Sequence, residues 1–382
     1  MKSLKLANTG DFPIAQIMIG TETPWQSKGD LTIKSIDISV STGNESGRCT
    51  VVLSKIAPNF KLGKFVPESE IKVVKQGSPI RIFLGYPAVA GSLPNTYEVF
   101  SGFISKVKID YDRELAVAVI ECLDAKMWMM PGCTFEKKIQ TKYSSIVNDT
   151  LLPAYLGKID KATVKIQEEP TLSQPVYQTN ESDYEFLCRL AGITGCLFYM
   201  YCGTAYFISP KALVSDPKAG LSIVPCDSLK KVSWSADVLG LSQQVVIKGV
   251  DTKKPKVSAQ SKPVGTNLGN IGNGQLPKNI GSATKKVITD LKADTVKTAQ
   301  FMAQAKFTRK SIDYIKCIVS LSGYADSPEF FKLGMRVSVS DMGQDISNTY
   351  ILTGIKHKFN GQKRTFATDL TLSSDAMSTT TL

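Results

Sequence analysis

Histidine is nearly absent from this sequence, which has His357 as its only example in 382 residues. One histidine excludes an HExxH zinc motif and argues against any histidine-rich metal site. The sequence also has no GxSxG nucleophile motif and no Walker loop, and the glycines of residues 269–274 do not follow the dinucleotide-binding order. We therefore predict no catalytic residue, no metal and no cofactor.

Long apolar runs are also missing. No run approaches the roughly 18 residues that a transmembrane helix needs. The first 20 residues lack the continuous apolar stretch of a signal peptide, because Asn8, Thr9, Asp11 and Gln16 interrupt it. We expect a soluble globular protein of about two or three domains. We also expect it to be made and kept in the cytosol, without a signal peptide, unless a larger assembly carries it out.

Cysteine is present but unpaired in the sequence pattern. None of the eight cysteines forms a CxxC motif, and their spacing fits neither a zinc ribbon nor a disulfide framework. In a reducing compartment a buried cysteine behaves as a small hydrophobic residue, and we predict that role for them. The cysteines are Cys49, Cys122, Cys133, Cys188, Cys196, Cys202, Cys226 and Cys317.

The net charge of +12 is concentrated in one segment. Residues 251–310 contain eleven lysines and Arg309 against three aspartates, a net charge of +9. Three interpretations stay open: a solvated loop, docking to an acidic protein partner, or binding of nucleic acid. Interleaved aromatic residues, which are typical of single-strand binders, are missing there. The candidate docking lysines are Lys253, Lys254, Lys256, Lys262, Lys285 and Lys286.

The segment 31–124 is predicted to form short strands. Apolar and polar residues alternate in LTIKSIDISVS, and a change of phase between Ile33 and Ile36 indicates a β-bulge. Further short strands bounded by turn residues follow, and strands resume after about residue 312. This pattern favours a sandwich or barrel.

Helical spacing appears in the middle of the chain. We predict a helix from about Thr141 that Pro153 ends, and another that starts at a capping box formed by Ser182 and Glu185. A two-residue turn at Gly203-Thr204 predicts a hairpin directly afterwards. A third helix is predicted at 294–310, preceded by a long polar loop at 253–281.

His357 and the pair Asp183 and Glu185 are the candidates for catalytic residues, but structural roles explain them more simply. His357 lies within a strand pattern, where a lone histidine more often packs or donates a hydrogen bond. Asp183 and Glu185 resemble an acid and base pair. Both are explained by capping and by the favourable placement of acids at a helix N-terminus.

The segment VYQTNESDYEFLCRLAGITGCLFYMYCGTAYFIS resembles the hallmark of the late control D, VgrG and phage baseplate hub superfamily. Three other stretches, SPIRIFLGY with EVFSGFISKVKIDY, KKIQTKYSSIVNDTLLPAY, and residues 331–372, resemble the same family in the same order. The resemblance spans roughly Leu31 to Leu372. The matching hallmark residues are Tyr177, Gln178, Glu181, Asp183, Phe186, Leu187, Arg189, Leu190, Ala191, Gly195, Phe198 and Tyr199.

The resemblance implies a mainly β fold with an α+β insertion. Two related β-barrel domains would form a trimeric ring of pseudo-sixfold symmetry. The expected division is a first barrel at 1–130, the α+β insertion at 131–235, a discontinuous second barrel at 236–258 and 312–372, a basic loop and helix at 259–311, and a tail at 373–382. VgrG proteins continue into a spike, and this sequence ends after the second barrel, so the resemblance implies a separate spike protein.

The function implied is that of a non-enzymatic baseplate hub in a contractile phage tail, tailocin or injection system. The expected partners are two further copies of the chain, the spike, the tail tube or its initiating protein, and the tape-measure protein. A small-molecule substrate is not expected. The alternatives are a cell-wall hydrolase at the tail tip and a nucleic-acid-binding protein that uses residues 251–310.

Overall fold

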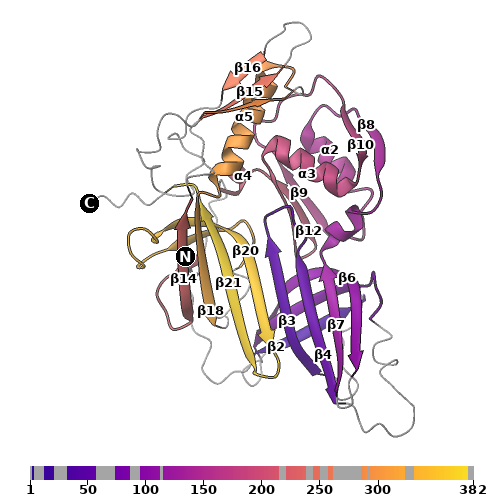
Figure 1. The fold of residues 1–382 in the computed structure, drawn as a ribbon, viewed down its shortest axis with the longest axis vertical. Helices are drawn as coiled ribbons and strands as arrows, with labels where there is room; N and C mark the ends of the chain where they lie inside the picture. The colour runs from indigo at the N-terminus through magenta and orange to yellow at the C-terminus, as the bar shows by residue number, and fades with distance from the viewer. Residues whose placement is uncertain are drawn as a thin grey trace.

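The protein is mainly β, with four α-helices and one short 3-10 helix among the described residues. The structure is a computed structural model. It describes residues 2–3, 13–20, 32–56, 74–86, 95–111, 115–214, 221–237, 244–249, 257–260, 285–290, 293–322 and 331–376. Thirteen strands form one large sheet, and three smaller sheets lie with the helices at the other end of the molecule (Figure 1).

The first half of the large sheet comes from the N-terminal third of the chain. Its strands pair antiparallel in the order β3-β4-β7-β6-β5-β2. The predicted bulge is confirmed, because the register of β3 against β4 shifts between Ile33 and Ser35. The strands are β2 (Ile14–Ile19), β3 (Thr32–Ser41), β4 (Arg48–Ile56), β5 (Pro79–Tyr86), β6 (Asn95–Tyr111) and β7 (Leu115–Leu123).

The second half is built mostly from the C-terminal part, and β20 is its branch point. One edge of β20 pairs with β21, and the other pairs with β19 near its start and with β3 near its end. The strands are β1 (Lys2–Ser3), β13 (Leu221–Ile223), β14 (Leu229–Ala236), β18 (Ile315–Ser322), β19 (Arg336–Val339), β20 (Asn348–Asn360) and β21 (Thr365–Ser374).

The prediction of two closed barrels is wrong for the described strands. Residues Gly354 to Asn360 of β20 pair with Ser41 to Ser35 of β3, so the edges of the two strand groups bind each other. A strand edge that is satisfied by the other group is no longer available to close its own barrel. The result is one continuous sheet with no closed barrel in the part of the chain that the structure describes.

The smaller sheets carry the rest of the strands. Two strands pair antiparallel as β8 (Thr134–Lys138) and β10 (Val176–Glu181). The other sheets are β9 (Lys161–Lys165) with β11 (Leu197–Tyr201) and β12 (Thr204–Ile208), and β15 (Gln244–Gly249) with β16 (Val257–Gln260) and β17 (Lys285–Thr289). The presence of β16 corrects the loop predicted at 253–281, most of which lies outside the described residues.

The helices pack beside these smaller sheets. They are η1 (Ala125–Met129), α2 (Tyr143–Leu151), α3 (Asp183–Thr194), α4 (Pro210–Val214) and α5 (Val296–Ser311). The predicted helices correspond to α2, α3 and α5. The predicted hairpin exists, but its turn is Cys202-Gly203, one residue earlier than expected. Both residues have positive φ, as a type I′ turn requires.

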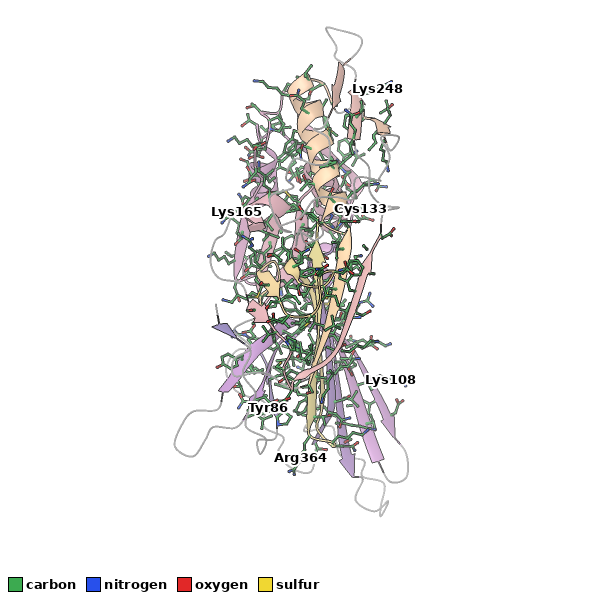
Figure 2. All side chains as sticks on the ribbon, turned by 90° about the vertical axis from the view of Figure 1, so that its left-hand side faces the viewer. Tyr86, Lys108, Cys133, Lys165, Lys248 and Arg364 are labelled. Atoms are coloured by element: carbon green, nitrogen blue, oxygen red, sulfur yellow. The ribbon has the colours of Figure 1, made fainter. Side chains whose placement is uncertain are left out.

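Two clusters of buried apolar residues form the cores. One lies on the large sheet, and the other lies among α2, α3, α5 and the smaller sheets. The side view shows Lys248 at the helical end of the molecule and Arg364 at the opposite end of the large sheet (Figure 2). No helix of the described residues is long and apolar enough to cross a membrane.

The end of the chain corrects the predicted tail. Ser373, Ser374, Asp375 and Ala376 are buried, although we expected a tail from residue 373. Ser374 donates a hydrogen bond to the carbonyl of Thr349 at 3.0 Å, which holds this segment on β20. The expectation of a tail overlooked that a polar segment can be buried when its groups form hydrogen bonds.

Candidate interaction surface

The start of α3 is fixed by a complete capping box. The amide of Glu185 donates to Oγ of Ser182 at 3.2 Å, and the amide of Ser182 donates to the Glu185 carboxylate at 2.8 Å. These bonds lower the pKa of Glu185, because they stabilise its ionised form. Gly195 ends the helix in the left-handed region, at φ 67°. The predicted capping box is confirmed.

The polar hallmark residues form one network between β10 and α3. Nε of Arg189 donates to both carboxylate oxygens of Glu181, at 3.1 and 3.0 Å, and Arg189 also donates to the carbonyl of Tyr177 at 2.7 Å. Asp183 accepts from the Tyr155 hydroxyl at 2.6 Å and from the Gln178 side chain at 2.8 Å. These acids are occupied by structural partners.

The apolar hallmark residues are buried beneath this network. Phe186, Leu187 and Leu190 are fully buried in the core shared by α2, α3 and α5. The guanidinium of Arg189 lies 5.1 Å from the centre of the Phe186 ring. The hallmark therefore combines a helix cap, an ion pair and a core stripe into one structural unit.

A groove of about 580 Å³ lies beside the hallmark. Its walls come from the start of α2, residues 172–181, one face of α3 and the start of α5. Glu181 and Arg189 line the groove together with apolar side chains such as Tyr143 and Ile193. A catalytic acid here would have to be Glu181 or Asp294, and these are paired with Arg189 and Ser173. Both acids of the groove are therefore held by neighbouring side chains.

Exposed apolar side chains surround one side of the groove. Phe135 is 75% exposed and lies on β8 directly opposite Thr179 of β10, on the same face as Tyr177, which is 46% exposed. Ile139, just after β8, is 74% exposed. Side chains that alternate along a strand share a face, so Phe135 and Tyr177 present one apolar surface to solvent. Large apolar groups gathered on a surface are typical of protein interfaces.

The predicted basic segment falls mostly outside the described residues. Lys253, Lys254, Lys256 and Lys262 lie there, and Lys285 is placed only as a residue of β17. Lys286 is exposed and lies close to Lys310 of α5, which lowers the pKa of Lys310 because like charges disfavour each other. Two neighbouring ammonium groups favour an anionic partner at this position.

His357 occupies a structural position, as predicted. It is buried on β20, where its Nδ1 lies 3.0 Å from the Thr368 hydroxyl. Burial lowers the pKa of His357 to about 3, because a charged imidazole loses its hydration there. No group of three histidine, cysteine, aspartate or glutamate side chains among the residues described could hold a metal ion.

Lys126 has a role that the sequence did not predict. Its ammonium group donates to the carbonyls of Gly43, Asn44, Glu45 and Phe198 at 2.8–3.3 Å. Burial lowers its pKa, and the charge of the neighbouring Asp124 opposes that change. A lysine surrounded by apolar residues in the sequence DAKMWMM was the one available signal. This contact ties the β3–β4 turn to β11.

A comparison with protein-family models shows the family of the chain. The family described as "Alg8 N-terminal domain" matches residues 30–361. The chain belongs to this family. The matched residues include most strands of both halves of the large sheet. No curated protein sequence matches the chain.

Solved structures with a similar fold are tail proteins and injection-system proteins. A tail protein from Neisseria meningitidis MC58 is 12% identical, with a TM-score of 0.66 over 95% of this chain and 97% of that chain. The 43 kDa tail protein of prophage MuSo2 from Shewanella oneidensis is 16% identical, with a TM-score of 0.66 over 96% and 99%. A chain of the Francisella PdpA-VgrG complex is 8% identical, with a TM-score of 0.56 over 98% of this chain and 60% of that chain. These likenesses establish a shared fold.

Proposed function

We propose that this chain is a structural baseplate hub of a contractile phage tail, tailocin or injection system. The observation that carries the proposal is the match to two tail proteins over nearly the whole of each chain, 95–96% of this one and 97–99% of the others. A match of that extent includes the large sheet, the helical end and their connection. An isolated module shared by unrelated proteins would cover much less.

We propose a ring of three copies with pseudo-sixfold symmetry. Each half of the large sheet would form one segment of the ring wall. Three chains would then offer six similar surfaces to a sixfold tail tube. In this proposal the chain is divided at residues 130, 235, 258 and 311, as the family resemblance implies, and residues 373–376 stay with the second half because they are buried against it. The pairing of β3 with β20 would make the two wall segments of one chain a rigid unit.

The surface around Phe135, Ile139 and Tyr177 supports an assembly role. These side chains are exposed in the single chain, and burying a large apolar side chain contributes about 1.5–3 kcal/mol. The adjacent groove gives a partner side chain a place to insert. We propose that this surface is covered by a neighbouring protein of the baseplate.

The proposed role is mechanical. The hub would be assembled from a cytoplasmic pool into the particle, holding a separate spike on one face and the tube or its initiating protein on the other. The tape-measure protein would end in the central channel of the ring formed by three hub chains. Extensive interfaces rather than a reactive site would then determine its function.

Localisation of the chain in assembled particles tests this proposal. A tagged chain labelled with gold should appear at the junction of the tube and the spike in electron micrographs of purified particles. Deleting its gene should prevent tube assembly. Label along the sheath, or normal particles without the chain, would reject the hub role.

A variant pair tests the surface. Phe135→Ser combined with Ile139→Ser should leave the chain folded, because both side chains are exposed, but should reduce its incorporation into particles. Glu136→Ser is the matched control, since Glu136 is also exposed on β8 but lies on the opposite face. Equal incorporation of all variants would refute a role for this surface.

A further inference from the structure

Cys49 and Cys122 face each other on neighbouring strands at the centre of the first half-sheet. The register of β4 and β7 places them directly opposite each other. In the same ladder, the amide of Asp124 donates to the carbonyl of Gly47 at 3.0 Å, so Gly47 and Asp124 form a hydrogen-bonded pair. Hydrogen-bonded and open pairs alternate along an antiparallel ladder, so Cys49 and Cys122 occupy the next hydrogen-bonded position.

This position fits the dimensions of a disulfide. The Cα atoms of a hydrogen-bonded antiparallel pair are about 5.5 Å apart. Disulfides most often join Cα atoms separated by about 5.5–6 Å. Residues directly opposite each other also project to the same face of the sheet, so the two thiols lie side by side. Cys122 is a side-chain hydrogen-bond partner of Cys49, so the two thiols already lie within reach of each other across the ladder.

The surroundings of the pair are apolar and closed to solvent. Cys49 and Cys122 are each 1% exposed, and both belong to the core of the large sheet. Ile38 and Ile104 are their neighbours across the ladder on either side. Burial and the neighbouring Cys122 thiol raise the pKa of Cys49, so the Cys49 thiol is neutral and unreactive while the strands stay closed.

The other cysteines lack this arrangement. Cys317 faces Trp234 and Leu372 in its strand ladders, and Cys133 is exposed. Within the described strand pairings, Cys49 and Cys122 are the cysteines placed opposite each other. The sequence pattern did not predict this cysteine pair, because β5 and β6 lie between β4 and β7 in the sequence and the pattern does not show that β4 pairs with β7.

We propose that Cys49 and Cys122 form a redox pair, reduced in the cytosol and joined as a disulfide by a small-molecule disulfide such as oxidised glutathione. After losing its proton to water, the thiolate of one cysteine attacks a sulfur of the oxidant and releases one glutathione thiolate. The second cysteine, also deprotonated, attacks the resulting mixed disulfide and releases the other. Two electrons pass to glutathione, and one bond forms between the cysteine sulfurs.

The exchange requires access to a buried pair. It therefore takes place during folding or when β4 and β7 separate transiently, and once formed the bond is protected by the same core. The link closes the chain from β4 to β7, including β5 and β6, which restricts the unfolded state and raises the midpoint of thermal unfolding. This inference does not depend on the hub role, because it rests on the strand register alone.

Refolding in a redox buffer tests the pair without relying on slow access to the folded core. The full chain is unfolded in urea, diluted into mixtures of oxidised and reduced glutathione, quenched with an alkylating agent and mapped without reduction. We expect one linked peptide pair that contains Cys49 and Cys122 and has lost the mass of two hydrogen atoms. We also expect a higher melting temperature that falls again when the bond is reduced.

Variants define the controls. Cys49→Ala and Cys122→Ala should each lose the linked peptide and the oxidant-dependent rise in melting temperature, whereas Cys133→Ser should keep both. The proposal fails if both thiols stay free, if they carry only glutathione, or if the links join other cysteines. Particle assembly would be unaffected by such a result, so this test and the test of the hub role can fail separately.

Discussion

Lys126→Met breaks the contact that joins the β3–β4 turn to η1 and β11. The Lys126 ammonium donates to four carbonyl oxygens with only three hydrogens, so one N–H is shared, and it lies 5.0 Å from the centre of the Phe198 ring. Asp124, also buried, accepts from the amide of Gly47 at 2.6 Å. Methionine keeps much of the volume but removes the charge and every donor.

The expected cost is worked from these contacts. Lys126 and Asp124 are neighbouring buried charges of opposite sign. Removing one of two such charges destabilises a protein by up to about 3–5 kcal/mol, because the other charge is left buried without it. The carbonyls that lose their donor add to this cost, since each unsatisfied buried group costs about 1–3 kcal/mol unless water reaches it. The turn carbonyls are near the surface and can recover water. We therefore expect a total loss of about 3–5 kcal/mol in the free energy of unfolding.

Urea denaturation followed by tryptophan fluorescence measures this loss. The double variant Lys126→Met with Asp124→Asn should regain part of the stability, because replacing both charges avoids a buried unpaired one. A loss below about 1 kcal/mol for Lys126→Met would mean that the ammonium is solvated, as in an exposed pair. That result would refute the structural role given to Lys126.

Three further predictions concern the helix and the buried histidine. Phe186→Ala should lower the free energy of unfolding by about 3–5 kcal/mol, and unchanged thermal stability would contradict its core position. Gly195→Ala should lower the free energy of unfolding by about 2 kcal/mol, because an added Cβ would lie 2.4 Å from the Ala305 carbonyl oxygen and the residue has φ 67°. Gly192→Ala is the control in the same thermal melt. Its added Cβ meets open space, so the free energy of unfolding should rise by about 0.5–1 kcal/mol. His357 should make stability fall as pH drops below about 6.5, since the unfolded chain binds the proton and the folded chain does so only near pH 3. The loss by pH 5 should be about 2 kcal/mol, and an equally steep pH dependence in His357→Asn would refute this source.

Local features of the fold were predictable from the sequence. The capping box at Ser182 and the bulge after Ile33 each depend on residues within a few positions of one another. Their hydrogen bonds and backbone angles are set locally, so the pattern of residue types is sufficient to identify them. The turn at Cys202-Gly203 was misplaced by one residue, because a cysteine with positive φ is uncommon.

Features that depend on distant segments were not predictable. The pairing of β3 with β20 joins segments from opposite ends of the chain. The alternation of apolar and polar residues within a strand does not identify the strand with which it pairs. The groove beside α3 likewise combines residues from four separate segments. The sequence pattern did not single out Phe135, and its exposure became evident only when β8 and β10 were seen to form a separate two-stranded sheet.

The oligomeric state tests the central claim most directly. Native mass spectrometry of the purified chain, alone and mixed with a candidate spike protein from the same particle, measures how many copies associate. The hub account predicts a species with three copies of this 382-residue chain, which the spike stabilises. A chain that stays monomeric in the presence of its spike would contradict the account.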